Sequence, residues 1–243
     1  MKVLEFVNVS KNFCHDDEII EVLDDISFDV EEGEIVAIVG PSGAGKSTIL
    51  NLISKLLVTT QGEVKVKGNI GYMFQRDCLF EWKTIYKNIL LGLEIQKNKT
   101  EANIKSVNRM IEEYDLKDFI NAYPTQLSGG MRQRVALIRT LAVNPDILLL
   151  DEPFAALDYQ TKLIVSNDIY NIIKKEKKTA IMVTHDISEA ISMADKIIVL
   201  SNRPATIKKQ YNIIIEEESP IKKRQNHKFQ EYFELIWDEI NNE

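Results

Sequence analysis

The spacing of hydrophobic and polar positions changes along the chain, and the changes predict strands that alternate with helices. Alternating positions predict short strands at Lys2–Val9, Ile26–Val30, 63–67 and 70–74. The mostly apolar run Glu34–Val39 predicts a strand that is buried on both faces. A glycine-rich turn follows this run, and a helical stretch then extends from Lys46 to about Leu57.

The second half of the chain returns from helical to strand patterns. From Arg76 to Val143 the pattern is helical, and Thr100 can cap a helix there. The apolar runs at 146–150 and 179–184 flank a helix from about Tyr159 to Lys175, which predicts a βαβ unit. One more strand is expected at 196–200, then a charged loop over 216–227 and a terminal amphipathic helix.

Composition narrows the classes of function. The chain has 243 residues with 44% hydrophobic and 28% charged residues, typical of a soluble globular protein. We expect no membrane span and no signal peptide, because a carboxylate interrupts the N-terminal pattern. Cys14 and Cys78 lie far apart and form no redox or metal motif, which favours a reducing cytoplasm. The net charge of −7 disfavours nucleic acid as a partner.

The glycine-rich turn fits the phosphate-binding pattern G-x-x-x-x-G-K-[ST]. Its members are Gly40, Pro41, Ser42, Gly43, Ala44, Gly45, Lys46, Ser47 and Thr48. A buried strand before the turn and a helix after it are the context that this pattern requires. The glycines let consecutive N–H groups face one anion. We expect Lys46 to reach the β- and γ-phosphates of a nucleotide and the Ser47 hydroxyl to bind Mg²⁺.

Polar residues follow three of the predicted strands. Asp151 and Glu152 come directly after the run at 146–150, where Asp151 would hold Mg²⁺ and Glu152 would orient or deprotonate the attacking water. His185 ends the next strand and can donate to the γ-phosphate or position the water. Gln75 follows the strand at 70–74, and its amide can join the Mg²⁺ shell.

A second glycine pair indicates how the nucleotide is used. The residues are Leu127, Ser128, Gly129, Gly130 and Met131, at the start of another helix. Ser128 can cap that helix, and the glycines free backbone amides for phosphate. Because one compact domain can rarely wrap both loops around one nucleotide, the pair predicts a dimer that closes on ATP.

Together these motifs resemble the ATP-binding subunits of ABC transporters over nearly the whole chain. Gly40–Thr48 resembles the Walker A motif, Ile147–Asp151 the Walker B motif and Glu152 the catalytic glutamate. The remaining matches are Gln75 with the Q-loop, Leu127–Met131 with the signature, His185 with the switch histidine, Asp158 with the D-loop and Phe13 with the aromatic that stacks on adenine.

The resemblance implies an α/β fold: a P-loop NTPase (RecA-like) core with an N-terminal antiparallel β subdomain and an inserted α-helical subdomain. The implied division of the single domain 1–243 is a nucleotide-binding core at 1–75 and 144–215, a helical insert at 76–143, and a charged loop with a C-terminal helix at 216–243.

The resemblance also implies partners. Two copies would sit head to tail with two ATP molecules between them, although pairing with a different subunit stays open. The insert and Q-loop would form a groove for an integral membrane permease on the inner face of the cell membrane, served by an extracellular solute-binding protein. Trp82 and Tyr86 are candidates for this groove, although both could instead pack within the insert.

Three features are similar to importers of nitrate, sulfonate, taurine and related solutes: Met131, the segment Leu79–Thr84 and Asn202–Pro204. Importers of pyrimidine vitamin precursors are also similar. Two further functions stay open, namely a soluble ABC-type ATPase that does not transport and a P-loop kinase or GTPase. The glycine pair and His185 disfavour a kinase or GTPase, and Glu152 disfavours a binding module that does not hydrolyse ATP.

Overall fold

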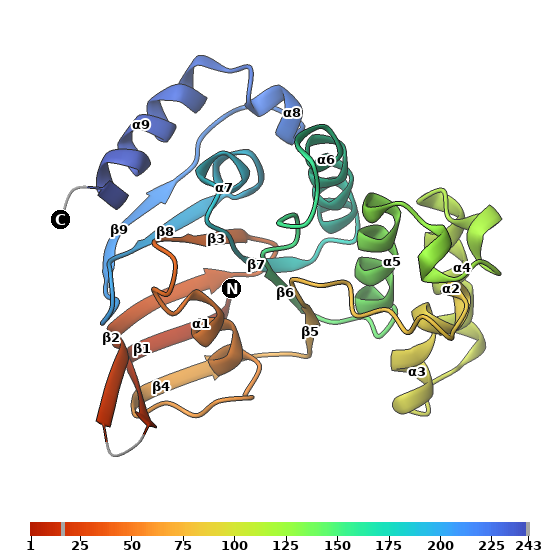
Figure 1. Ribbon diagram of the computed structural model, residues 1–243, viewed down its shortest axis with the longest axis horizontal. Coiled ribbons are helices and arrows are strands. Elements are labelled where there is room, and N and C mark those ends of the chain that lie inside the picture. The colour runs from red at the N-terminus through yellow and green to blue at the C-terminus, as the bar shows by residue number, and fades with distance from the viewer. Residues whose placement is uncertain (16–17, 242–243) are drawn as a thin grey trace.

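The computed structural model describes residues 1–15 and 18–241, and its strands form two sheets (Figure 1). The three-stranded sheet is antiparallel in the order β2-β1-β4, and the six-stranded sheet has the order β5-β6-β7-β3-β8-β9. The strands of the first sheet are β1 (Lys2–His15), β2 (Glu18–Glu31) and β4 (Gln61–Val66). Those of the second are β3 (Ile35–Val39), β5 (Ile70–Met73), β6 (Ile147–Asp151), β7 (Thr179–Val183), β8 (Lys196–Leu200) and β9 (Ile207–Asn212).

The six-stranded sheet is parallel except at one edge. β5, β6, β7, β3 and β8 pair in parallel, whereas β9 pairs antiparallel with β8. The βαβ unit expected around 159–175 is confirmed, since β6 and β7 are parallel neighbours joined through α6 (Tyr159–Lys175). The antiparallel sheet and the mixed parallel sheet together confirm the α/β class expected from the sequence.

The boundaries of β1, β2 and α1 differ from the sequence prediction, and one further strand, β9, was not predicted. β1 and β2 extend well beyond the predicted segments, because register shifts along their pairing break the simple alternation of side chains. β9 was not predicted; its burial is intermediate or exposed rather than alternating. The predicted helix from Lys46 to Leu57 is too long, because α1 (Lys46–Ile53) ends at Ser54 and Lys55 has a positive φ of 60°.

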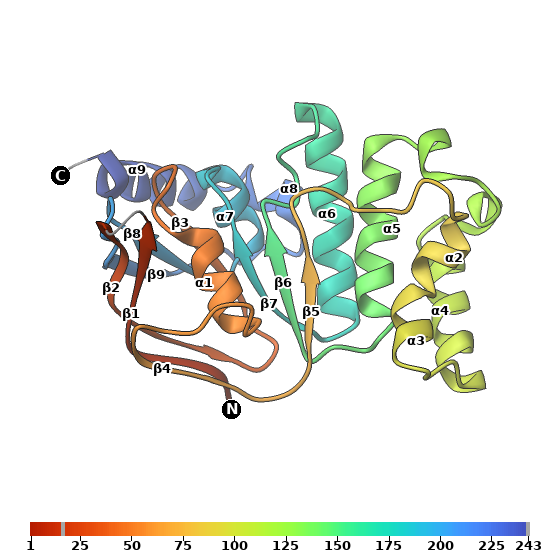
Figure 2. The same cartoon turned by 60° about the horizontal axis from the view of Figure 1, so that its bottom comes forward.

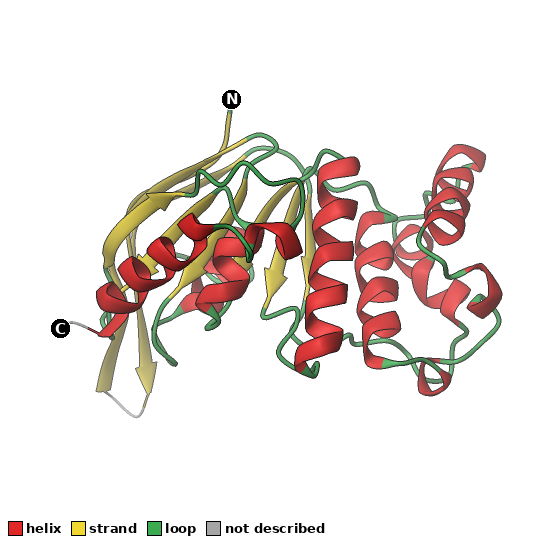
Figure 3. Cartoon of the chain, turned by 90° about the horizontal axis from the view of Figure 1, so that it is seen from above, coloured by secondary structure: helices red, strands yellow, loops and turns green. Residues whose placement is uncertain are grey.

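Helices cover both faces of the six-stranded sheet and form one end of the molecule. The remaining helices are α2 (Ile85–Ile89), α3 (Leu91–Ile95), α4 (Glu101–Glu113), α5 (Gly129–Leu141), α7 (Ile187–Met193), α8 (Pro220–Lys223) and α9 (His227–Asn241), with 3₁₀ turns at Lys117–Phe119 and Pro124–Gln126. Figure 3 shows that only helices and loops form the end of the molecule that contains α2 to α4. As expected, Thr100 caps α4 by accepting a hydrogen bond from the Asn103 N–H.

Burial of β3 on both faces explains its apolar sequence. Ile35, Ala37 and Val39 belong to the core cluster that includes residues of α5, α6 and α7. Val36 and Ile38 belong to the other cluster, which includes residues of α1 and the antiparallel sheet. All five side chains are fully buried, so the parallel strands are fixed between two cores.

The segment predicted as a charged loop over 216–227 contains the short helix α8. Ser219 accepts a hydrogen bond from the Lys222 N–H, and Pro220 and Lys223 are buried. The Lys223 ammonium lies 5.2 Å from the centre of the Tyr170 ring, which gives this cation an aromatic partner on α6. The prediction of a solvated loop was wrong here because Lys223 can bury its stem against α6.

Over the part of the chain that the structure describes, no helix has the length and apolar character needed to span a bilayer.

A buried ion pair joins α6 to α7. The Lys162 ammonium lies 2.8 Å from Glu189, whose side chain is only 3% exposed. The Thr184 hydroxyl donates a 2.6 Å hydrogen bond to the same carboxylate. Lys162 also approaches Asp186, which caps α7 through the N–H groups of Ser188 and Glu189. The pair therefore fixes the segment that follows β7.

Replacing Lys162 with Met should destabilise the protein by about 3–5 kcal/mol, because a buried carboxylate then loses its cation. Calorimetric unfolding would measure the loss, and the double variant Lys162→Met/Glu189→Leu should recover most of it. Lys65→Met is the matched control, since Lys65 pairs with Glu63 at 3.5 Å on the surface, and it should cost less than about 1 kcal/mol. Equal stability of Lys162→Met and wild type would contradict the importance of the pair.

Candidate active site

The loop between β3 and α1 is shaped by glycines at positions that other residues would strain. Gly43 and Gly45 have φ values of 82° and 87°. A Cβ at Gly45 would lie 2.8 Å from Val22 and 2.9 Å from Leu23, so only glycine fits against β2 there. The loop can therefore curl closely around the start of α1, where the free N–H groups of the helix point outward.

Lys46 is held inside this loop. Its ammonium donates hydrogen bonds to the carbonyl oxygens of Gly40 at 2.9 Å and Pro41 at 2.8 Å. Burial lowers the pKa of Lys46, and the negative charges of Glu152 and Asp151 oppose that shift. The side chain is thus a cation fixed at the centre of the loop, close to two carboxylates.

Asp151 at the end of β6 meets the start of α1. The Ser47 hydroxyl donates to Asp151 at 3.1 Å, and the Tyr72 hydroxyl donates to its second oxygen at 3.3 Å. Burial raises the pKa of Asp151, while the two hydrogen bonds oppose the rise. Burial and the charge of Asp151 raise the pKa of Tyr72. A hydroxyl and a carboxylate oxygen therefore lie together, and both are donor types that suit Mg²⁺.

Glu152 links two further strand ends. Its carboxylate lies 3.2 Å from Nδ1 of His185 and 3.5 Å from the amide nitrogen of Gln75. The backbone of Glu152 has a φ of 42°, an unfavourable conformation for a non-glycine residue, and its N–H donates to Val183 at 3.0 Å. The three residues come from the ends of β6, β7 and β5, so the structure joins residues that are up to 110 positions apart.

A cavity of about 420 Å³ opens above the phosphate loop. Its lining includes six predicted loop residues and Glu152, together with Phe13, Ile20, Val22 and Arg203. Phe13 is 36% exposed and pairs with Ile20 across the β1–β2 hairpin, so its ring lies at the cavity rather than in the core. The Lys11 ammonium lies 4.9 Å from the centre of that ring. The lining therefore combines the polar phosphate loop with apolar side chains of β1 and β2, a composition that suits a nucleotide.

Other predicted residues do not line the cavity themselves, but most of them contact residues that do. Gly40 and Pro41 accept the hydrogen bonds of Lys46, and Ala44 is buried behind the loop. Asp151 contacts Ser47, while Gln75 and His185 contact Glu152. The described residues contain no cluster of three or more His, Cys, Asp or Glu side chains that could bind a metal. A cation at Ser47 and Asp151 would therefore need phosphate oxygens as further ligands.

The second glycine pair and Asp158 are not brought to this cavity. Ser128 caps α5 by accepting a hydrogen bond from the Met131 N–H, and Gly129 and Gly130 form its first turn. In Figures 1 and 2 the strands β5 to β7 lie between α1 and α5, and α6 packs beside α5. A Cβ at Gly130 would lie 2.7 Å from Val165 of α6, so this glycine also allows close helix packing.

Asp158 has a local role in the structure as the cap of α6. Its side chain accepts a hydrogen bond from the Thr161 N–H at 3.1 Å, and this bond lowers the pKa of Asp158. The side chain is exposed, as is that of Ser128, so both lie on the surface of the single chain.

Sequence reasoning missed several residues of the site, and Tyr72 and Arg203 are the two with polar contacts there. Tyr72 contacts Asp151, but one tyrosine in a short strand carries no signal by itself. The sequence singles out Arg203 only as a mark of a subgroup, whereas the structure places it in the cavity lining. Its position after β8, next to β3, can be inferred only once the strand order is known.

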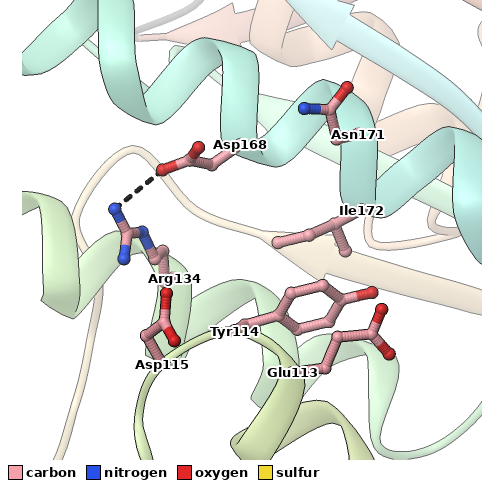
Figure 4. A pocket seen from close by; sticks show the side chains of 7 residues that line it. All are labelled: Glu113, Tyr114, Asp115, Arg134, Asp168, Asn171 and Ile172. Carbon is pink, nitrogen blue, oxygen red and sulfur yellow. Dashed lines mark ion pairs between the residues drawn. The ribbon is translucent and has the colours of Figure 1, made fainter.

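A separate cavity of about 220 Å³ lies between the end of α4 and helices α5 and α6 (Figure 4). The Arg134–Asp168 ion pair, with a 2.7 Å separation, joins α5 to α6 at its edge. Burial raises the pKa of Asp168, and Arg134 opposes the rise. The residues that line this cavity include none of the predicted site residues. It belongs to the packing of α4 and α5 against α6.

Comparisons with known proteins agree with these features. Residues 23–155 match the ABC transporter family. The chain is 44% identical to the uncharacterized ABC transporter ATP-binding protein YtlC of Bacillus subtilis, over 99% of this chain and 96% of the relative. It is 36% identical to the nitrate import ATP-binding protein NrtD of Synechocystis sp., over 98% of this chain and 93% of that protein.

A solved structure of an ATP-binding cassette has a similar fold. The dimeric post-hydrolysis structure of the ATP-binding cassette MJ0796, bound to ADP and Pi, matches with a TM-score of 0.72 and 33% identity. The match covers 87% of this chain and 99% of that chain. The P-loop NTPase fold expected from the motifs is thereby confirmed. The chain belongs to the ATP-binding subunits of ABC transporters, a family that binds and hydrolyses ATP.

Proposed function

We propose that this chain is the ATP-hydrolysing subunit of an ABC importer and that its ATP sites form between two copies of the chain. The proposal rests on one observation: the phosphate loop and the second glycine turn, which would together enclose a nucleotide, lie apart in the single chain. The cavity at the phosphate loop is lined by Lys46, Ser47 and Glu152, whereas none of residues 127–131 lines it and Gly130 packs against α6 instead. A second copy, placed head to tail, would bring its own glycine turn to the open side of the cavity.

We propose roles for the phosphate loop, Phe13 and the polar residues at the strand ends. The backbone N–H groups of the phosphate loop and the Lys46 ammonium hold the β- and γ-phosphates. Glu152 orients or deprotonates the attacking water, because its carboxylate is placed between His185 and Gln75. His185 and Gln75 then position that water and the γ-phosphate. Phe13 offers a flat apolar face for the adenine ring at the other end of the cavity.

Mg²⁺ is proposed as the accompanying cation. The Ser47 hydroxyl and Asp151 carboxylate, 3.1 Å apart, would hold it, with Gln75 as a further oxygen donor. A divalent cation bound there neutralises charge on the phosphates.

The helical insert at 76–143 is proposed to bind the permease. The segment that follows Gln75 is irregular but fixed: Arg139 donates to the carbonyls of Cys78 at 2.7 Å and Asp77 at 2.6 Å. The fully buried Asn88 is bonded to both the N–H and the carbonyl of Phe80. Trp82 is 74% exposed and stacks on Phe80, which makes it an aromatic contact on the surface. Tyr86 instead packs partly against the core.

We also propose the setting. The core would comprise 1–75 and 144–215, with 216–243 as a C-terminal extension. The subunit would lie on the inner face of the cell membrane, bound to the permease and served indirectly by an extracellular solute-binding protein. The similarity to nitrate, taurine and aliphatic sulfonate import ATP-binding proteins supports nitrate, sulfonate or taurine as the solute class.

Glu152→Gln should lower the ATP hydrolysis rate by roughly 10²–10³-fold, because the carboxylate that acts on water is lost. ATP binding should persist, and light scattering after gel filtration should show a dimer with ATP and Mg²⁺. Glu231→Gln on the exposed side of α9 is the matched control and should behave as wild type. A Glu152→Gln variant that hydrolyses ATP at the normal rate would contradict the proposed role.

Mixing two inactive variants tests whether the site forms between copies. Lys46→Ala destroys the phosphate loop, and Ser128→Arg blocks the glycine turn. A mixed head-to-tail dimer contains one intact site, because the loop of one subunit meets the turn of the other. ATPase activity of the mixture should therefore exceed the sum of the separate activities. No recovery, in a mixture shown by pull-down to form mixed dimers, would mean that the loop and turn do not act in trans.

Trp82→Ala should weaken capture of the permease without changing ATP affinity, because the side chain is exposed and does not line the cavity at the phosphate loop. The tagged chain would be purified with native membranes, and the permease and any bound solute identified by mass spectrometry. Trp237→Ala is the matched control, since Trp237 is 53% exposed on α9. Undiminished capture by Trp82→Ala would place the permease contact elsewhere.

A further inference from the structure

Arg203 connects the turn after β8 to the phosphate loop. Its Nε and Nη2 atoms both donate to the carbonyl oxygen of Gly43, at 3.2 and 2.9 Å. The two ends of this contact are 160 residues apart in sequence. They meet because β8 pairs in parallel with β3, so that both strands end at the same edge of the sheet.

The turn that carries Arg203 is itself well anchored. The Ser201 N–H donates to the Thr206 carbonyl at 3.0 Å, which closes the turn. Ala205 exchanges backbone hydrogen bonds with β2, through the Val22 carbonyl and the Asp24 N–H, each 2.9 Å long. Arg203 is therefore attached to a fixed base rather than to a free loop.

We propose that Arg203 is a positioning residue for nucleotide binding, which it promotes by holding the peptide between Gly43 and Ala44 in one orientation. The carbonyl and the N–H of a trans peptide point in opposite directions. A guanidinium that holds the Gly43 carbonyl on one side therefore directs the Ala44 N–H to the other side. That N–H donates to the Pro41 carbonyl within the loop, at 3.2 Å.

The peptide needs these hydrogen bonds from Arg203 because the backbone of Gly43 can adopt many conformations. Its φ of 82° is accessible to glycine, which also adopts other backbone conformations at little cost. Two charge-assisted hydrogen bonds to one oxygen select a single conformation before the nucleotide arrives. Arg203 also lines the same cavity as Lys46, so its positive charge lies beside the proposed phosphate site.

The contact uses two N–H groups of one side chain, which arginine can supply in this geometry and lysine cannot. A guanidinium offers two N–H groups in a fixed plane, whereas an ammonium is a point charge on a flexible stem. Arg203 is exposed, so replacing it creates no buried void. A change in nucleotide affinity without a change in stability is therefore the result that separates a positioning role from a merely structural one.

The test compares Arg203→Gln and Arg203→Lys with wild type. Binding of a fluorescent ADP analogue and of ATP with Mg²⁺ would be titrated, KM and kcat measured, and thermal unfolding followed without nucleotide. Lys209→Gln on the exposed side of β9 is the matched charge control and should behave as wild type. For Arg203→Gln we expect about tenfold weaker binding and an equal rise in KM. Its kcat should stay within about twofold and its unfolding midpoint within about 2 °C of wild type.

Arg203→Lys should retain the charge but only part of the affinity. Wild-type affinity in Arg203→Gln would overturn the proposal, and so would wild-type affinity in Arg203→Lys, since charge alone would then suffice. A lower unfolding midpoint with an equal loss of kcat would overturn it by showing a structural role. The inference rests on the proposed phosphate site, which Lys46→Ala tests separately. If that variant binds nucleotide normally, the proposed site fails; if it loses binding while Arg203→Gln does not, only the inference fails.

Discussion

The parallel alignment of β3, β6, β7 and β8 is the constraint on which the rest of the molecule depends. Parallel strands that share one sheet end at one edge, so the segments that follow them must meet there. The phosphate loop, Asp151–Glu152, His185 and the Arg203 turn are those segments. The two apolar cores on either side hold the strands in register, so the same packing also fixes the residues at the strand ends.

Two energetically unfavourable features occur at this edge, a strained backbone and a buried charge. Contacts with neighbouring residues stabilise both. Glu152 adopts a positive φ of 42°, while its N–H is held by the carbonyl of Val183 on the neighbouring strand. Lys46 is a buried cation whose lowered pKa reflects the loss of water, with two carbonyls and two carboxylates as compensation. Such arrangements are typical of sites where orientation matters more than stability.

Beyond the sheet edge, contacts between helices connect the site to the rest of the chain. Lys162 and Glu189 tie the start of α6 to α7, close to His185. Arg139 and Asn88 fix the irregular segment between Gln75 and the surface aromatic Trp82. The irregular segment that joins Gln75 to Trp82 is therefore held in place by contacts with α2 and α5.

The sequence by itself determined the chemistry of the site and most of the secondary structure. The loop Gly40–Thr48, the acidic pair after β6 and the cap at Ser128 depend on neighbouring residues, so local patterns suffice to find them. Boundaries were less predictable where bulges shift β1, where β9 lacks an apolar face, and where α8 occurs in a charged segment.

Only the tertiary structure decided which distant residues touch. It places Tyr72 on Asp151 and Arg203 on Gly43, and it packs the glycine turn after Ser128 against α6, outside the lining of the cavity. The physical reason is that these contacts follow from strand order and helix packing. Both are set by the burial of many side chains at once, which no single segment of the sequence records.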